Sequence, residues 1–258
     1  HAYGLPRVLM LDVGGTTTDV GTVWDYKIAT ARRGNIYGIP VSYELSDVHS
    51  SGVGGSSIIA VEDGQIIVGP KSVGAAPGPA CFGFGGTQAT ITDVNLLLGV
   101  LDPDTYLDGE MFLDTDRSRA VIQQSIAEPL NITVEEALID MASAYAHKVS
   151  ESFASLVDNK ETTLAAFGGG GPMSACEAAR IAGVRKVLIP KLAAVFSAYG
   201  ISFSDISQTH EHNITDLSEA QIEDVAGELK SRATRDMFQE GYDMDECTLD
   251  WSYLVEHA

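Results

Sequence analysis

The chain has 258 residues with 26 glycines and 45% hydrophobic content, which suits one large or two small α/β domains with many tight loops. Its formal charge of −20 argues against nucleic acid and anionic membranes as partners, and no apolar stretch approaches the roughly 20 residues that span a bilayer. Three cysteines far apart, with no C-x-x-C pair and no secretion-type segment, favour a cytoplasmic location and argue against structural zinc.

Residues 7–24 are predicted to form two antiparallel strands joined by a short polar turn. The turn lies within the sequence LDVGGTTTDV, which runs from Leu11 to Val20 and places Asp12 and Asp19 on either side of two glycines and three threonines. Glycines let backbone N–H groups approach an oxygen closely, and carboxylates hold hard cations. The turn therefore suits a phosphate group with its Mg²⁺, and the alternative is an ordinary Gly-Gly hairpin with a polar turn.

Several loop features follow before the first long helices. A glycine- and serine-rich segment begins at His49, a residue that is either structural or a general base. The Asp63-Gly64 pair between two β-branched runs predicts a second hairpin. A long glycine- and proline-rich loop then spans residues 69–86, and Asp93 either caps the next helix or belongs to a site.

The second half of the chain reads as an alternation of helices and strands. Apolar periodicity and capping residues, such as the Thr133–Glu136 pair, set the expected helix starts. Helices are predicted at 114–130, 133–158, 172–182 and 218–237, and strands at 162–167, 186–190 and 248–255. The short links between residues 162 and 190 predict a parallel pair of strands.

A second glycine cluster, Gly168 to Gly171, lies between a predicted strand and a predicted helix. Backbone donors at a helix N-terminus and the helix dipole favour a phosphate, and the missing side chains leave room for a flat base. Glycine loops also serve packing in α/β proteins, so this cluster alone leaves both interpretations open. Its position well downstream of the Asp12 hairpin resembles the order of motifs in one lobe of an actin-like ATPase.

Six segments, taken in order, carry a family resemblance. They are Asp12–Val20, Gly52–Ser57, Val68–Gly83, Thr90–Gly99, Phe167–Pro172, and Phe196–Gly200 with Asp205. In this order they resemble the hydantoinase A and 5-oxoprolinase family, which includes subunits of acetone and acetophenone carboxylases. Two departures concern Ser56, where the family often has a third glycine, and Met173-Ser174, near which it often has a histidine. If that histidine serves ring hydrolysis, its absence favours a different reaction.

The hairpin by itself resembles the phosphate loops of the actin, sugar kinase and Hsp70 superfamily. The two resemblances together imply an α/β fold in which residues 1–207 form a ribonuclease H-like (actin-like ATPase) lobe with a mixed sheet and a helical insertion at about 100–160. Residues 208–258 would begin a further C-terminal domain as a truncated α+β segment. A missing N-terminal lobe with its own hairpin and a second, hydantoinase B-like subunit are the implied partners.

The family resemblance also implies ATP and Mg²⁺, or another divalent metal, as cofactors. The implied reaction activates a cyclic amide or imide carbonyl of a small-molecule substrate for ring opening, at the expense of ATP. The ATP-binding subunit of an acetone- or acetophenone-type carboxylase is one alternative, and a non-catalytic actin-like assembly domain is another. Because one lobe leaves a nucleotide half open to water, the chain alone is expected to be inactive.

The site residues implied by the resemblance fall on the two glycine segments and one helix start. Asp12, Asp19 and Asp93 would be catalytic. Asp12 and Asp19 would also hold the metal, and Asp93 would lie on the substrate side. The phosphates and the nucleoside would be bound by Gly14, Gly15, Thr16 and Thr17 and by Gly168, Gly169, Gly170 and Gly171.

Overall fold

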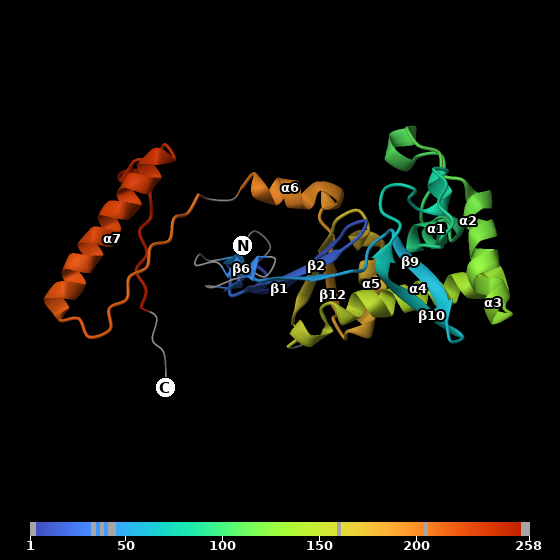
Figure 1. Cartoon of the computed structure of the whole chain (residues 1–258), viewed down its shortest axis with the longest axis horizontal. Helices are drawn as coiled ribbons and strands as arrows, with labels where there is room; N and C mark the ends of the chain where they lie inside the picture. The colour runs from blue at the N-terminus through green and yellow to red at the C-terminus, as the bar shows by residue number, and fades with distance from the viewer. Residues whose placement is uncertain are drawn as a thin grey trace. The chain divides into compact units, whose positions relative to one another are not determined.

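The structure is a computed structural model that describes residues 4–31, 35–36, 39–40, 45–158, 161–203 and 206–253 (Figure 1). The chain divides into two compact units. The first comprises His1–Ala31 and Leu45–Phe203, and the second comprises Arg32–Glu44 and Ser204–Ala258. The domain boundary predicted at residues 207 and 208 stays a prediction.

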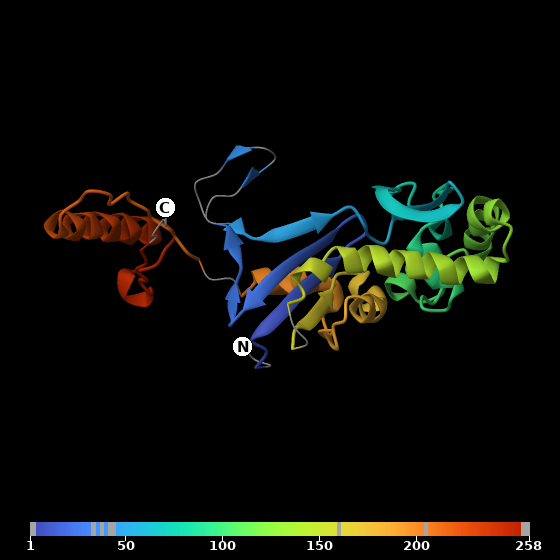
Figure 2. The ribbon, with the colours of Figure 1, turned by 90° about the horizontal axis from the view of Figure 1, so that it is seen from below.

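A mixed six-stranded sheet forms the centre of the first unit (Figure 2). Its strands are β1 (Arg7–Val13), β2 (Thr18–Trp24), β3 (Lys27–Ile28), β8 (Val48–Ser51), β11 (Thr163–Phe167) and β12 (Lys186–Leu188). The order is β12-β11-β1-β2-β3, and β8 also pairs with β2. β1, β11 and β12 are parallel, whereas β2 is antiparallel to β1, β3 and β8. The predicted α/β class, the first hairpin and the parallel pair are therefore confirmed.

The side chains of β1 point alternately to the two faces of the sheet, so that one face belongs to the core and the other carries the candidate site. Leu9, Leu11 and Val13 are 0% exposed, whereas Asp12 belongs to the opposite, half-buried set, because successive side chains of a strand point to opposite faces. Helix α5 (Gly171–Ile181) packs on β1 and β11, and α4 (Val134–Glu151) packs on α5. The ring of Phe167 contacts α6 (Phe196–Ile201), which lies on the other side of the sheet from α4 and α5 (Figure 1).

The rest of the first unit is built on the hairpin of β9 (Ser57–Glu62) and β10 (Gln65–Ser72). Its turn has positive φ at both Asp63 and Gly64, the backbone that a two-residue Asp-Gly hairpin requires, so this prediction is confirmed. The helices are α1 (Ile91–Leu97), α2 (Thr115–Ile122) and α3 (Glu128–Leu130), with a π-helical turn at Gln123–Ala127. The short 3₁₀ turns are Ala80–Phe82, Tyr106–Gly109, Ala154–Leu156 and Ala193–Val195. A separate two-stranded pair is formed by β4 (Thr30–Ala31) and β7 (Leu45–Ser46).

The predicted helix starts are confirmed more closely than the helix lengths. α4 begins at the expected capping box, in which Thr133 and Glu136 exchange hydrogen bonds. It ends at Glu151 rather than near 158, and a 3₁₀ turn replaces its expected last part. The helix expected over 114–130 is interrupted by the π-helical turn, after which Pro129 lies in the first turn of α3.

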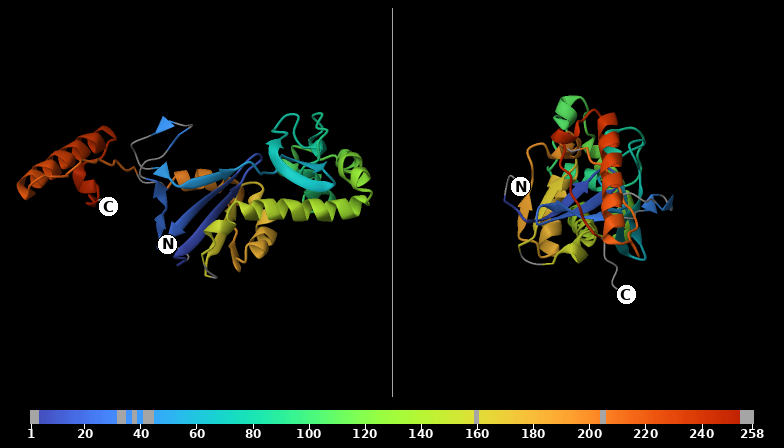
Figure 3. Two further views of the ribbon diagram at one scale, coloured as in Figure 1. Left: turned by 60° about the horizontal axis from the view of Figure 1, so that its bottom comes forward. Right: turned by 90° about the vertical axis from the view of Figure 1, so that its left-hand side faces the viewer.

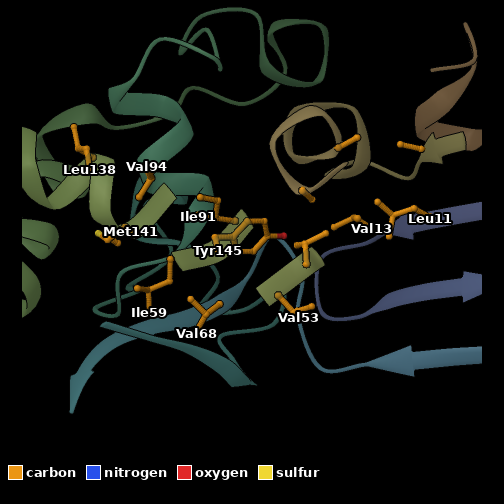
Figure 4. Close-up of a cluster of buried hydrophobic side chains, with 14 of the residues drawn as sticks. Leu11, Val13, Val53, Ile59, Val68, Ile91, Val94, Leu138, Met141 and Tyr145 are labelled. Carbon is orange, nitrogen blue, oxygen red and sulfur yellow. The ribbon is translucent and has the colours of Figure 1, made fainter. Parts of the chain in front are cut away.

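One buried cluster joins the sheet to the β9–β10 hairpin and helices α1 and α4 (Figure 4). It includes Val13 from β1, Val53 from the loop after β8, Ile59 from β9 and Met141 and Tyr145 from α4. Because each segment contributes fully or almost fully buried apolar side chains, the loop between β8 and β9 is fixed by the same core that fixes β1.

The second unit contains β5 (Asn35–Ile36), β6 (Ile39–Pro40), which pairs with it, α7 (Glu219–Gln239) and a 3₁₀ turn at Met244–Glu246 (Figure 3). The helix predicted over 218–237 is confirmed as α7, which begins at a capping box formed by Ser218 and Gln221. The strand predicted at 248–255 is wrong over 248–253, which are not in a strand, and residues 254 and 255 lie outside the described residues. Apolar alternation fits a sheet face, but no described strand pairs with this segment. Over the described ranges, no helix combines the length and apolarity needed to cross a membrane.

Candidate functional site

The first hairpin places two carboxylates beside each other. In the β1–β2 register, Asp12 lies directly opposite Asp19, and Val13 opposite Thr18. Directly opposed residues of an antiparallel pair share one face, with Cβ atoms ~5 Å apart, and like charges there are destabilising. A divalent cation between the two carboxylates would remove that repulsion, and carboxylate oxygens are the ligands that Mg²⁺ prefers.

The turn of the hairpin directs backbone N–H groups outward. Gly14 N–H donates to the Thr17 carbonyl at 2.9 Å, and the carbonyls of Gly14 and Gly15 accept from the N–H groups of Gly55 (3.0 Å) and Ser56 (2.6 Å). The peptide bonds after Gly14 and Gly15 are trans, so each N–H points opposite to the carbonyl of the preceding residue. The N–H groups of Gly15 and Thr16 therefore point away from residues 55–56, on the exposed side of the turn.

Residues 52–57, here called the supporting loop, lie directly against the turn. A Cβ atom on Gly54 would come within 2.7 Å of the Gly15 carbonyl carbon and the Thr16 nitrogen. The Thr92 hydroxyl at the start of α1 donates to the Gly55 carbonyl at 2.8 Å. The supporting loop is thus held between the hairpin and α1, and a glycine at 54 is required by the close approach of two backbones.

The hydroxyl groups of the turn divide between support and exposure. The buried Thr18 donates to the Val53 carbonyl at 2.7 Å, so this third threonine anchors the turn to the core. Thr17 is exposed and its hydroxyl lies 3.4 Å from an Asp19 oxygen. Asp19 also accepts a hydrogen bond from Ser50, its cross-strand partner in β8. The two threonines predicted to bind phosphate, Thr16 and Thr17, are both exposed.

The second glycine cluster lies beside the first, as the sequence interpretation requires. Gly168 has φ +80°, and a Cβ there would come 2.3 Å from an Asp12 carboxylate oxygen and 2.5 Å from the Val13 carbonyl oxygen. Gly170 N–H donates to that same Val13 carbonyl at 2.8 Å. Gly169 is exposed, and Gly171 is buried at the first turn of α5. The end of β1 thus carries both glycine segments.

A residue to which sequence analysis assigned no role contacts Asp12 directly. Ser197, the second residue of α6, donates a hydrogen bond from Oγ to Asp12 Oδ2 at 2.5 Å. The aromatic ring of Phe196 lies against that of Phe167, with centroids 5.1 Å apart. A lone serine gives no spacing signal, and only its place in the Phe196–Gly200 segment of the family resemblance marked this region.

Asp93 is the third residue of α1 and part of the capping box at the start of that helix. It is 0% exposed and forms the capping box with Thr90. Its carboxylate also accepts from the Cys81 N–H at 2.9 Å and from the Ser118 hydroxyl at 2.7 Å. Burial raises the pKa of the Cys81 thiol, and the Asp93 charge raises it further. We therefore assign Asp93 to the support of the 80–82 turn, and its predicted catalytic role stays untested.

His49 is separated from the two acids by the pleat of the sheet. It lies opposite Val20 in the β2–β8 register, one residue from the Asp19–Ser50 pair. Since adjacent residues of a strand point to opposite faces, His49 does not face the carboxylates. Among the described residues no group of three or more His, Cys, Asp and Glu side chains could hold a metal ion. Asp12 and Asp19 instead fit Mg²⁺, which is usually held by one or two carboxylates together with waters and phosphate oxygens.

These features define a mixed α/β protein in which two glycine segments meet beside a pair of opposed carboxylates. The chain belongs to the hydantoinase/oxoprolinase family, whose model matches residues 1–210. The resemblance seen in the sequence is thereby confirmed. It is 34% identical to the acetophenone carboxylase gamma subunit of Aromatoleum aromaticum, over 83% of the chain and 30% of that protein. It is 29% identical to the caprolactamase subunit alpha of Pseudomonas jessenii, over 98% of the chain and 38% of that protein.

Two solved structures are similar over most of the chain. Acetone carboxylase in its nucleotide-free form matches with a TM-score of 0.76 and 26% identity, and the ATP-dependent caprolactamase from Pseudomonas jessenii matches with 0.75 and 29%. Each match covers 95% of this chain and 37% of the other. The chain therefore spans less than two fifths of the length of these relatives.

Proposed function

We propose that this chain is the ATP-binding lobe, of ribonuclease H-like and actin-like type, of an enzyme that activates a cyclic amide or imide carbonyl for ring opening. The observation that carries the proposal is the meeting of the two glycine segments at the end of β1, beside Asp12. Relatives include the ATP-dependent caprolactamase and 5-oxoprolinase 1 of Arabidopsis thaliana, which is 31% identical over 76% of the chain.

Each part of the site has a place in phosphoryl transfer, which needs mainly positioning and charge neutralisation. The outward N–H groups of Gly15 and Thr16 would bind phosphate oxygens, and Asp12 and Asp19 would hold Mg²⁺. The exposed Gly169 leaves room for the nucleoside next to α5. Because the chain carries a charge of −20, backbone dipoles and the cation would have to provide the attraction for an anionic nucleotide. The nucleotide would supply the phosphoryl group that activates the substrate carbonyl.

A second candidate is the ATP-binding subunit of a ketone carboxylase. Two observations favour it: the 34% identity to the acetophenone carboxylase gamma subunit, and Met173-Ser174 where the family often has a histidine. A non-catalytic assembly domain is the third candidate. All three candidates would use the same nucleotide-binding fold. They can therefore be distinguished by which substrate, if any, stimulates ATP hydrolysis.

The deciding experiment measures ATP hydrolysis by the full-length protein with its hydantoinase B-like partner subunit. The hydrolase should be stimulated by hydantoin, 5-oxoproline or caprolactam, and the carboxylase by a ketone with bicarbonate. Asp12→Ala should lower turnover at least about 100-fold, the scale of losing one preorganised electrostatic group. Asp140→Ala, at an exposed acid of α4, is the matched control. No ATP turnover by the parent protein, together with an Asp12→Ala variant that still assembles, would support the assembly domain instead, and unchanged turnover in Asp12→Ala would refute the role proposed for Asp12.

The chain by itself should hydrolyse little ATP, because a single lobe leaves the nucleotide open to water. Robust Mg²⁺-dependent turnover by the 258-residue chain would refute that expectation.

A further inference from the structure

The Ser197–Asp12 contact joins residues 185 positions apart. It connects the exposed start of α6 with the strand that carries the hairpin acid. Serine hydroxyls on a helix surface commonly bond the carbonyl one turn earlier, as Ser174 does with Gly170 at 3.1 Å. Ser197 instead reaches out of its own segment to a carboxylate, which makes this contact a feature of the site rather than of the helix.

Three neighbouring contacts hold Ser197 in that position. Gly168 N–H donates to the Ala193 carbonyl at 2.8 Å, which fixes the turn before α6 to the second glycine cluster. Phe196 packs on Phe167, and Phe167 is the β11 partner of Asp12 in the sheet register. The serine hydroxyl is therefore delivered to Asp12 by backbone and ring contacts that do not involve the hydroxyl itself.

The Asp12 carboxylate is confined on its other side as well. Its Oδ1 would lie 2.3 Å from a Cβ on Gly168, so Oδ1 is close to the glycine backbone while Oδ2 accepts from Ser197. An ionised carboxylate has about four acceptor sites. One bond from Ser197 fixes the rotation of the group and leaves sites for a cation and its waters.

We propose that Ser197 is a positioning residue that holds the Asp12 carboxylate in the orientation needed to bind a divalent cation together with Asp19. This inference rests on the proposed function, because it assigns the Asp12–Asp19 pair to a nucleotide-bound cation. Ser50 holds Asp19 from the neighbouring strand β8, so each acid accepts a hydrogen bond from a serine hydroxyl. Ser197 differs because its segment is also bonded to the second glycine cluster, which links the nucleoside side of the site to the metal side.

The test uses Mn²⁺ as a spectroscopic substitute for Mg²⁺. Mn²⁺ binding in the presence of ADP is followed by electron paramagnetic resonance in the full-length protein, for the parent, Ser197→Ala and Ser197→Thr. Ser202→Ala is the matched control, because its hydroxyl lies near the end of α6 and bonds the Tyr199 carbonyl at 2.7 Å. The Mg²⁺ dependence of turnover is measured in parallel, and melting temperatures show that each variant is folded.

Ser197→Ala should weaken Mn²⁺ binding about 10-fold, the effect of one hydrogen bond to a charged group, and should raise the Mg²⁺ concentration for half-maximal turnover equally. Turnover at saturating Mg²⁺ should stay near that of the parent. Ser197→Thr, which keeps the hydroxyl, should recover most of the affinity, and Ser202→Ala should match the parent.

Unchanged Mn²⁺ affinity in Ser197→Ala, or a threonine variant no better than the alanine variant, would overturn the positioning role. Asp12→Ala separates this failure from a failure of the proposed function. If Asp12→Ala loses ADP-dependent Mn²⁺ binding while Ser197→Ala does not, only the role of Ser197 is wrong. If Asp12→Ala binds Mn²⁺ and ADP like the parent, the proposed cation site itself is wrong, and the inference falls with it.

Discussion

Replacing Gly54 with alanine tests how closely the supporting loop holds the first hairpin. The added Cβ would lie 2.7 Å from Gly15 C and Thr16 N and 2.8 Å from Gly14 O. All three are backbone atoms, so no flexible side chain can move aside, and the hairpin or the supporting loop must shift. Overpacking of this kind costs ~1–3 kcal/mol, which for a domain of this size lowers the melting temperature by about 2–12 °C.

The substitution should also weaken binding of Mg²⁺·ADP, because a shift of the turn moves the outward N–H groups of Gly15 and Thr16. Differential scanning calorimetry and isothermal titration on the same preparation measure the two effects. Gly55→Ala is the matched control. The nearest atom to its added Cβ would be the Thr92 hydroxyl oxygen, 3.4 Å away, and its N–H would still donate to the Gly14 carbonyl. If both variants melt and bind like the parent, or if Gly55→Ala is the more damaging, the support described above is wrong.

The other predictions concern the α1 cap, the thiols and the α4 cap. Asp93→Asn should lower the midpoint of urea unfolding, since each buried donor left unsatisfied costs ~1–3 kcal/mol; an unchanged midpoint would count against the cap. A thiol reagent, mapped by mass spectrometry, should label the exposed Cys176 at once and Cys81 only after unfolding, because Cys81 is 0% exposed. The pKa of the Cys81 thiol is raised above its ordinary value of 9.0 in the folded protein. Just above pH 9 the thiol therefore ionises only in the unfolded chain, so the free energy of unfolding should decrease as the pH rises. Cys81→Ala should make this decrease smaller. The pKa of Glu136 is lowered from 4.5, mainly by the hydrogen bond from the Thr133 N–H. The stability that this carboxylate contributes is therefore present above pH 4.5 and is lost as the pH falls below it. Glu136→Gln should remove this acid dependence of the urea unfolding midpoint.

Features encoded by neighbouring residues could be predicted from the sequence. The Asp12–Asp19 hairpin, the Asp63-Gly64 turn and the Thr133 capping box each depend on a few adjacent positions whose backbone preferences agree. The parallel pairing around Gly168 followed from the short strand–loop–helix–strand spacing. In each case the local signal and the tertiary packing favour the same structure.

Features that depend on distant partners could not be predicted in the same way. The supporting role of Gly54 requires knowing that its backbone lies against Gly15, and the role of Ser197 requires knowing which residue its hydroxyl reaches. A strand was predicted at 248–255, but a strand forms only where another strand supplies its hydrogen bonds, and no described strand pairs with residues 248–253. Asp93 was predicted either to cap the helix or to belong to a site, and the partners that give it a structural role, the Cys81 N–H and the Ser118 hydroxyl, are distant in the sequence.

The composition of the hairpin site explains why its support comes from so many small residues. A phosphate site built on a lysine tolerates small backbone movements, because a long side chain can follow its ligand. The turn at Gly14–Thr17 contains no basic residue, so, under the proposed function, its backbone N–H groups would have to point in the right direction before a phosphate binds. Gly54 sets the position of the turn and Gly168 admits the Asp12 carboxylate. A closely packed backbone at Gly54 and Gly168 would therefore take the place of the flexible basic side chain that the turn does not contain.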